Sequence, residues 1–179
     1  MKNGQKVLVS DIDGTIIWLS LPAQVHEFVF RHRCFLIFFL LIFPLACFFY
    51  FLRPRKKSAK IKIIKHRENG GRIVFVSATE DIFLARWIIG SWLKIWGVPY
   101  DRIALCPHNQ KVREFKLGIL KKEHCDIFLE NEIPIVAYVT KKMIQLGKKR
   151  IVNIMGKNGY FTIHFATFDP SPMGVVTLI

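Results

Sequence analysis

A long apolar segment near the N-terminus restricts how this chain can fold. Cys34–Leu52 is a run of 19 consecutive residues without a charged side chain. As a helix it would measure roughly 28 Å, about the thickness of the hydrocarbon core of a bilayer. The run starts too late to be a signal peptide, and no small-residue cleavage site follows it. Basic residues flank it on both sides: Arg31, His32 and Arg33 precede it, and eight Lys or Arg lie within Arg53–Arg67.

The charge balance of the whole chain is strongly positive. Its 179 residues include 27 Lys or Arg and 13 Asp or Glu, a formal net charge of +14. Such a chain is attracted to polyanions, which means nucleic acid or an anionic membrane surface. Hydrophobic residues make up 51% of the chain, which excludes disorder over most of its length. The four cysteines show no paired spacing, so we expect free thiols in a reducing compartment.

Outside the apolar run, short β-rich stretches alternate with amphipathic stretches. The expected strands are 6–10, 72–77, 102–106, 126–129, 150–155 and 160–168, and the expected helices are 81–96, 110–122 and 134–146. The basic stretch 53–68 is interpreted as an exposed helix or loop. Strands separated by helices indicate βαβ units, and Asn158-Gly159 predicts a hairpin turn. The sequence therefore predicts an α/β fold, a Rossmann-like parallel sheet with an antiparallel C-terminal β-hairpin at its edge.

Polar side chains follow three of the predicted strands. In an open parallel sheet, functional residues gather at the carboxyl ends of the strands. Asp11 and Asp13 follow the first strand, Ser77 and Thr79 the second, and Glu130-Asn131-Glu132 the fourth, while Lys116 lies on the helix before the fourth strand. Phosphoryl transfer through a covalent intermediate needs these groups: a carboxylate nucleophile, an acid/base, donors for the phosphoryl oxygens, and oxygen ligands for magnesium.

Four short motifs resemble those of the haloacid dehalogenase-like (HAD) superfamily. The segment Asp11-Ile12-Asp13-Gly14-Thr15, directly after an apolar strand, resembles motif I, and Ser77 in IVFVSAT resembles motif II. Lys116 in REFKLGILKK resembles motif III. Glu130-Asn131-Glu132 after DIFL resembles motif IV, which commonly carries two aspartates. The resemblance covers residues 6–155 without the insertion between motifs I and II.

The resemblance implies a role for each of these residues. Asp11 would attack phosphorus and become an aspartyl-phosphate, and Asp13 would protonate the leaving oxygen and then deprotonate the hydrolytic water. The substrate phosphate would be bound by Thr15, Ser77, Thr79 and Lys116. Magnesium would be held by Asp11, the Asp13 carbonyl oxygen and the motif IV cluster. Within that cluster Asn131 is preferred as the ligand and Glu130 comes next, with Glu132 left open.

The position of the apolar run between motifs I and II constrains its topology. In the family this interval holds a cap, so the resemblance implies a HAD-like catalytic core over 1–15 and 70–179, and a hydrophobic and basic insertion over 16–69. A single membrane crossing would leave Asp11 and Ser77 on opposite sides, and one active site could not form. Two arrangements remain: a helical hairpin or in-plane segment attached from the cytoplasmic face, and the buried centre of a cap. In the first, the side chains expected to contact lipid are Phe35, Phe38, Phe39, Phe43, Phe48 and Phe49.

These observations favour a magnesium-dependent phosphomonoester hydrolase that acts on a lipid- or polyprenyl-linked phosphate at the membrane surface. An apolar anchor and an adjacent polybasic stretch supply the two signals that stable attachment to an anionic membrane requires. One alternative is a soluble phosphatase of nucleotides or nucleic-acid ends, which would use the net charge to attract a polyanion. Another is a non-catalytic membrane adaptor. For Trp87, Trp92 and Trp96, core packing and a place at the membrane interface both remain open.

Overall fold

The computed structural model describes residues 5–13, 15–16, 56–146, 149–155 and 159–166. In this part of the chain the elements are β1 (Val7–Asp11), α3 (Lys57–Glu68), β2 (Arg72–Glu80), α4 (Phe83–Ile95), β3 (Arg102–Cys106), α5 (Val112–Lys122), β4 (Ile127–Glu130), α6 (Ile133–Gln145), β5 (Lys149–Met155) and β6 (Phe161–Ala166). The apolar run 34–52 lies outside the described residues, and so do the expected lipid contacts Phe35, Phe38, Phe39, Phe43, Phe48 and Phe49. No helix in the described ranges is long and apolar enough to cross a membrane.

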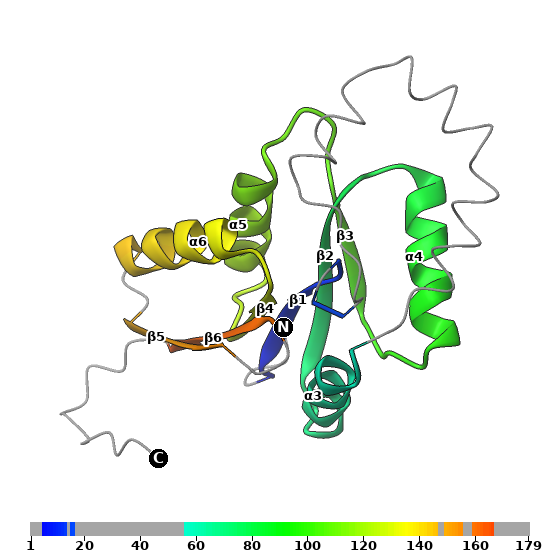
Figure 1. Cartoon of the computed structure of the whole chain (residues 1–179), viewed down its shortest axis with the longest axis horizontal. Helices are drawn as coiled ribbons and strands as arrows, with labels where there is room; N and C mark the ends of the chain where they lie inside the picture. Colours follow the sequence, from blue (N-terminus) through cyan, green and yellow to red (C-terminus); the bar gives the residue numbers. More distant parts are fainter. Residues whose placement is uncertain (1–4, 14, 17–55, 147–148, 156–158, 167–179) are drawn as a thin grey trace.

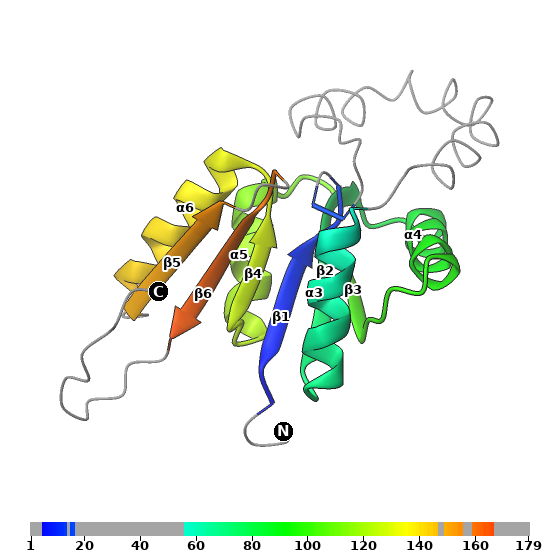
Figure 2. The same cartoon turned by 60° about the horizontal axis from the view of Figure 1, so that its bottom comes forward.

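The six strands form one mixed sheet in the order β3-β2-β1-β4-β6-β5. The four strands from β3 to β4 run parallel, whereas β6 is antiparallel to β4 and β5 is antiparallel to β6. The structure thus confirms the predicted α/β class and the C-terminal hairpin. Helices cover both faces of the sheet, with α3 and α4 on one side and α5 and α6 on the other (Figures 1 and 2).

Side-chain alternation along β1 assigns its residues to two cores. Val7 and Val9 pack with residues of α5 and α6, whereas Leu8 packs with residues of α3 and α4. Successive side chains of a strand point to opposite faces, so Asp11 belongs to the face of Val7 and Val9. The same rule places Glu130 of β4 with Phe128, which also packs in the α5/α6 core. Both carboxylates therefore lie on the side of the sheet that α5 covers.

The basic stretch that the sequence left open as helix or loop is helix α3. Its apolar stripe is narrow: Ala59 and Ile63, four residues apart, are fully buried. They pack with Trp92 and Leu93 of α4 in the core on that face. Two lysines of α3 add polar contacts to neighbouring elements: Lys60 Nζ donates to the Trp96 carbonyl oxygen at 2.6 Å and Lys62 Nζ to Thr162 Oγ1 at 2.9 Å. The described part of the predicted insertion thus packs against the sheet.

Chain segments at either end of the undescribed range 17–55 meet at one point. The backbone N–H of Lys56 donates to the carbonyl oxygen of Ile16 at 2.6 Å. Ile16 is fully buried among the α3/α4 core residues. Lys56 is 7% exposed, and burial lowers the pKa of its ammonium, which lies 5.9 Å from the centre of the Tyr160 ring. The polypeptide therefore leaves the described core and re-enters it at adjacent residues.

Strand β2 is longer than expected. The sequence predicted its end at Ser77, but pairing with β3 resumes at Glu80, opposite Cys106, after an irregularity between Ser77 and Glu80. Irregularities of this kind re-aim side chains at functional edges of sheets. Helix α4 then begins at Phe83. Ile89 and Trp92 of this helix are buried, whereas Ile82 precedes the helix and is 40% exposed.

Candidate functional site

The polar residues singled out in the sequence gather at the carboxyl ends of β1, β2 and β4. Strands β2 and β3 lie on one side of β1 and β4 lies on the other. The strand order therefore reverses between β1 and β4, and such a reversal opens a crevice beyond the strand ends. Asp11 ends β1 and Glu130 ends β4, so these two carboxylates lie at the strand ends where the order reverses.

Lys116 of α5 joins the two carboxylates in a buried ion-pair cluster. Its Nζ lies 2.7 Å from Asp11 Oδ1 and 2.7 Å from Glu130 Oε2. The three residues are almost inaccessible: Lys116 is 1% exposed, Asp11 3% and Glu130 0%. Removing three charges from water is costly, and the cost is offset only where the charges contact one another with good geometry. The family resemblance implied that Lys116 and Asp11 share one site; the contact of Lys116 with Glu130 was not predicted.

Charge in this cluster is unbalanced, because two carboxylates share one ammonium. Burial by itself would lower the pKa of Lys116, but the charges and hydrogen bonds of Asp11 and Glu130 outweigh it and raise that pKa. Lys116 is therefore a fixed cation. The pKa of Asp11 is raised well above its ordinary value, first by burial and then by repulsion from Glu130 and Asp13, against the opposing effect of Lys116. A second cation beside Asp11 would restore the ionised carboxylate that a nucleophile needs.

Glu130 uses both of its carboxylate oxygens within the protein. Oε2 accepts from Lys116, and Oε1 accepts the backbone N–H groups of Asn131 at 3.0 Å and of Glu132 at 3.2 Å. The side chain thus fixes Lys116 and the loop after β4 at the same time. This arrangement favours Asn131 over Glu130 among the metal ligands that the sequence suggested. The period-two alternation that places Glu130 with Phe128 is the sequence signal that points it toward α5.

The side chain of Asn131 lies over the first motif. One atom of its amide group is 2.8 Å from the carbonyl oxygen of Asp13, 3.1 Å from Thr15 Oγ1 and 3.3 Å from Asp11 Oδ2. With nitrogen in that position, the two N–H groups of the amide lie within donating distance of these three oxygens, and this is the orientation that the contacts favour. With oxygen in that position, the Thr15 hydroxyl donates to it. The amide oxygen would then face the Asp13 carbonyl oxygen and Asp11 Oδ2, neither of which can donate, so that orientation would be favourable only beside a cation.

The oxygens around Asn131 are of the types that bind magnesium. Adjacent ligands in an octahedral Mg²⁺ site, with bonds of about 2.1 Å, lie about 3 Å apart, and the Asn131 amide atom lies 2.8 Å from the Asp13 carbonyl oxygen and 3.3 Å from Asp11 Oδ2. Within the described ranges, no three side chains of His, Cys, Asp or Glu group together to hold a metal ion. The set here differs in kind: a carboxylate from Asp11, a backbone carbonyl from Asp13 and an amide from Asn131. Ligands of this type, completed by water, are those that magnesium prefers.

Ser77 and Thr79 belong to β2, which lies on the opposite side of β1 from β4. Ser77 Oγ lies 3.2 Å from Asp13 Oδ2 and 2.9 Å from Thr79 Oγ1, and it accepts the backbone N–H of Thr79 at 3.1 Å. Ser77 is fully buried, whereas Asp13 and Thr79 are half-buried. The structure therefore brings Asp13 and the two predicted phosphate-binding hydroxyls together. Thr15 differs, since it is fully buried and its hydroxyl contacts Asn131, which suits it to orient that amide.

Glu132 is the third acidic candidate of this loop. It is half-buried and precedes the first turn of α6. Burial raises the pKa of its carboxyl group, Lys116 opposes that effect, and the charges of Glu130 and Asp13 add to it. Glu132 thus belongs to the electrostatic surroundings of the site.

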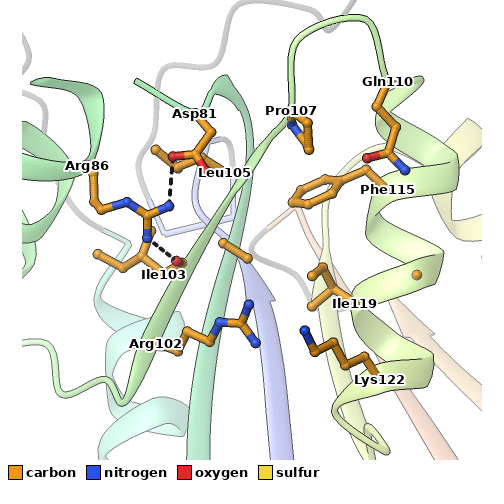
Figure 3. A pocket seen from close by; sticks show the side chains of 12 residues that line it. Asp81, Arg86, Arg102, Ile103, Leu105, Pro107, Gln110, Phe115, Ile119 and Lys122 are labelled. Carbon is orange, nitrogen blue, oxygen red and sulfur yellow. Dashed lines mark hydrogen bonds and ion pairs between the residues drawn. The ribbon is translucent and has the colours of Figure 1, made fainter. Parts of the chain in front are cut away.

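A separate groove of about 350 Å³ follows the edge strand β3 (Figure 3). Its cationic side chains are Arg86, Arg102 and Lys122, and its apolar lining includes Phe115 and Ile119 of α5. Arg86 bonds both Asp81 and the carbonyl oxygen of Ile103, which occupies part of the exposed strand edge (Figure 3). None of the predicted site residues lines this groove, although Phe115 is next to Lys116 in sequence.

Comparison with known proteins links the chain to a fold and to no family. No protein-family model and no curated protein matches it. A chain in the structure of the Pnkp1/Rnl/Hen1 RNA repair complex superposes with a TM-score of 0.55 and 13% identity, over 78% of this chain and 40% of that chain. A chain from a structure of the Pnkp1/Rnl/Hen1 complex gives a TM-score of 0.47 at 13% identity, over 69% and 36% of the two chains. The protein thus spans well under half the length of the chains it matches, and the first likeness shows the fold alone.

Proposed function

We propose that this protein is a magnesium-dependent phosphomonoester hydrolase of the HAD type. The observation that carries the proposal is the buried Lys116 ammonium, 2.7 Å from Asp11 Oδ1, beside an oxygen set that fits Mg²⁺. This ammonium contacts the carboxylate that ends β1. A nucleophilic aspartate needs an ammonium there, because the attacking carboxylate and the incoming phosphate are both anionic.

The reaction proceeds in two displacements at phosphorus. In the first, a carboxylate oxygen of Asp11 bonds to phosphorus, the bond to the leaving oxygen breaks, and Asp13 gives that oxygen its proton. In the second, Asp13 takes a proton from water, the water oxygen bonds to phosphorus, and the bond to Asp11 breaks to release inorganic phosphate. Ser77, Thr79 and Lys116 hold the phosphoryl oxygens. Asp11, the Asp13 carbonyl oxygen and Asn131 would hold magnesium, which would offset the negative charge of the phosphate and of Asp11.

For the substrate, we propose a lipid- or polyprenyl-linked phosphate at a cytoplasmic membrane surface. The support is topological: Ile16 and Lys56, which bracket the range with the apolar run, share a hydrogen bond of 2.6 Å. Because the two residues that flank the range are neighbours, the range begins and ends on the same side of a membrane. Attachment from one face requires this. Eight Lys or Arg within 53–67 add attraction to anionic lipid.

A substrate panel tests this function. The purified full chain is assayed on p-nitrophenyl phosphate, lipid phosphates, polyprenyl phosphates, nucleotides and 5′- or 3′-phosphorylated oligonucleotides, with magnesium or with EDTA. The proposal expects magnesium-dependent release of phosphate that Asp11→Asn abolishes, with lipid-linked substrates preferred. If no phosphate ester is hydrolysed under any of these conditions, the non-catalytic adaptor takes its place.

The second candidate is a phosphatase of nucleotides or nucleic-acid ends. It draws on the neighbour from an RNA repair complex and on the groove beside β3, where Arg86, Arg102 and Lys122 surround apolar side chains. A cationic groove with an apolar lining suits a single nucleic-acid strand. Preference for phosphorylated oligonucleotides over lipid phosphates in the same panel, with steep salt dependence, would select this candidate.

A further inference from the structure

The outer side of helix α4 carries large apolar side chains that the site does not use. Phe83 is 85% exposed, Trp87 57% and Ile95 68%, and we call these three residues the α4 stripe. Their spacing of four and eight residues places them on one side of the helix, away from the buried Ile89 and Trp92. Helix α4 is therefore apolar on two sides, and only one of them packs against the sheet.

Cations are abundant on the two helices of this layer. Helices α3 and α4 together contain seven Lys or Arg and a single carboxylate, that of Glu68. On α3, Lys57, Ile61 and Lys65 follow one another at intervals of four residues and are all exposed, so that an apolar side chain lies between two ammonium groups. On α4, Lys94 is exposed beside Ile95. Exposed aromatic and aliphatic side chains among cations are typical of a surface that lies in the headgroup region of an anionic bilayer.

The opposite helix layer lacks the aromatic part of this pattern. On α6, Ile133 is 64% exposed and Ile144 is 56% exposed. Its aromatic residue, Tyr138, is half-buried, with the Arg113 guanidinium 5.2 Å from the ring centre. Among the described residues, the exposed Phe and Trp side chains are both on α4. The two layers are thus distinguishable by aromatic residues, which favour the membrane–water interface.

We propose that the outer face of α3 and α4 is a docking surface for an anionic bilayer. The α4 stripe and Ile61 enter the headgroup region, and Lys57, Lys65 and Lys94 contact the lipid phosphates. This inference rests on the membrane part of the proposed function and adds an orientation to it. Both helices start at the carboxyl edge of the sheet, where Lys56 meets Ile16 and where β2 leads into Phe83 (Figure 2). A bilayer on this face would lie near the strand ends that carry the site.

The test measures where the Trp87 side chain lies. The full chain is reconstituted into phosphatidylcholine vesicles with and without phosphatidylglycerol, and its tryptophan fluorescence is quenched by lipids brominated at shallow or deep acyl positions. The Trp87 contribution is the difference between wild type and Trp87→Phe, a change that keeps the site apolar. We expect quenching by shallow brominated lipids, stronger with phosphatidylglycerol, that is lost in Trp87→Phe. Acrylamide in the same vesicles reports whether Trp87 is open to water.

Each other outcome overturns the proposal. A Trp87 contribution quenched by acrylamide but not by brominated lipid means that α4 faces water. Quenching by neither means that protein covers α4, either residues 34–52 of the same chain or a second copy, and cross-linking distinguishes these two.

Matched variants separate this inference from the proposed function. Phe83→Ser with Ile95→Ser is expected to remove the lipid quenching of Trp87, whereas Ile133→Ser with Ile144→Ser on α6 leaves it unchanged. Hydrolysis of p-nitrophenyl phosphate, which is soluble, should be equal in all of these variants. If wild type hydrolyses no phosphate ester but its Trp87 is quenched by lipid, the enzyme proposal fails and the docking surface stands. If hydrolysis is normal and Trp87 is not quenched, only the docking surface fails.

Discussion

The backbone N–H of Lys56 donates to the carbonyl oxygen of Ile16 at 2.6 Å, across 39 intervening residues that include the whole apolar run. The two described residues that flank range 17–55 are therefore hydrogen-bonded neighbours. Ile16 and the first turn of α3 belong to the same buried core, which fixes both attachment points independently of the segment between them.

This closure predicts that the core folds without the segment. In a variant without residues 17–55, a Gly/Ser bridge of about three residues should be long enough to join Ile16 to Lys56. The two residues are hydrogen-bonded neighbours, and tight turns connect such neighbours with loops of this length. The shortened protein should be soluble without detergent, unfold cooperatively and hydrolyse p-nitrophenyl phosphate, but lose most activity on a long-chain lipid phosphate. Circular dichroism and the two assays check this. Equal loss of both activities would show that the segment completes the site itself.

Cysteine labelling of the intact chain tests the same closure in membranes. With reactive cysteines introduced at positions 20 and 70, an impermeant reagent should label both from the same side of sealed vesicles. Labelling from opposite sides would contradict a shared site for Asp11 and Ser77.

The nucleophile and the acid/base should be separable. Asp11→Asn is expected to abolish turnover, since an amide oxygen does not form the acyl-phosphate. In the Asp13→Asn variant, Asp11 should still be phosphorylated by a substrate with a good leaving group such as p-nitrophenol. The phosphoenzyme should then be hydrolysed slowly, because no base is left to activate water. Burst kinetics and acid-stable labelling with ³²P-substrate measure this difference. Near-normal turnover of Asp11→Asn would refute the covalent mechanism.

Much of this site could be predicted from the sequence, because the carboxyl ends of parallel strands bring distant residues together. Asp11, Asp13 and Ser77 follow predicted strands, and Lys116 lies on the helix before the fourth strand. The structure brings these four residues together at one edge of the sheet. The contact between Glu130 and Lys116 was missed, since it depends on which face of α5 meets β4. The contact between Ile16 and Lys56 could not be predicted either, because these residues are 40 positions apart and no local sequence pattern links them. Helix α3 was left undecided because two buried residues, Ala59 and Ile63, are a weak periodic signal among cations.

Lys116 should matter to stability as well as to catalysis. Lys116→Met leaves the Asp11 and Glu130 carboxylates buried without their cation, which typically costs ~3–5 kcal/mol. Turnover should fall by about a hundredfold or more. The double change Lys116→Met with Glu130→Gln should recover part of the stability without recovering activity. Lys111→Met is the matched control: this exposed lysine precedes α5, and we expect a stability change within ~0.5 kcal/mol and normal turnover. If Lys111→Met lost activity and Lys116→Met did not, Lys111 and not Lys116 would be the lysine of motif III.

Asp101 should make stability depend on acid. Burial alone would raise the pKa of Asp101, but hydrogen bonds from Arg67 and from the Ile73 N–H, with the charges of Arg67 and Arg72, lower it below its ordinary value of 3.8. A lowered pKa in the folded state means that the stabilisation is present above pH 3.8 and is lost as the pH falls through the folded-state pKa. Asp101→Asn should therefore lower Tm at neutral pH, and the gap to wild type should close in acid below pH 3.8. A gap that persists there would mean that the amide perturbs packing.

The last prediction concerns which residue after β4 holds the metal. Asn131 contacts the oxygens of Asp11 and Asp13, whereas both oxygens of Glu130 are engaged by Lys116 and the loop backbone. Asn131→Ala should raise the magnesium concentration that gives half-maximal activity, by about a hundredfold if the ligand is lost outright. Asn131→Asp should lower it, because a carboxylate adds a charge at the same place.

Glu130→Gln is the discriminating partner of these variants. The glutamine can still accept hydrogen bonds from the Asn131 and Glu132 N–H groups. It removes one of the two carboxylate charges that contact the Lys116 ammonium. We expect a lower kcat with a nearly unchanged magnesium requirement, and titration of activity against magnesium for all three variants measures both quantities. A magnesium requirement raised more by Glu130→Gln than by Asn131→Ala would exchange the two roles, making Glu130 the ligand and Asn131 the residue that positions the loop.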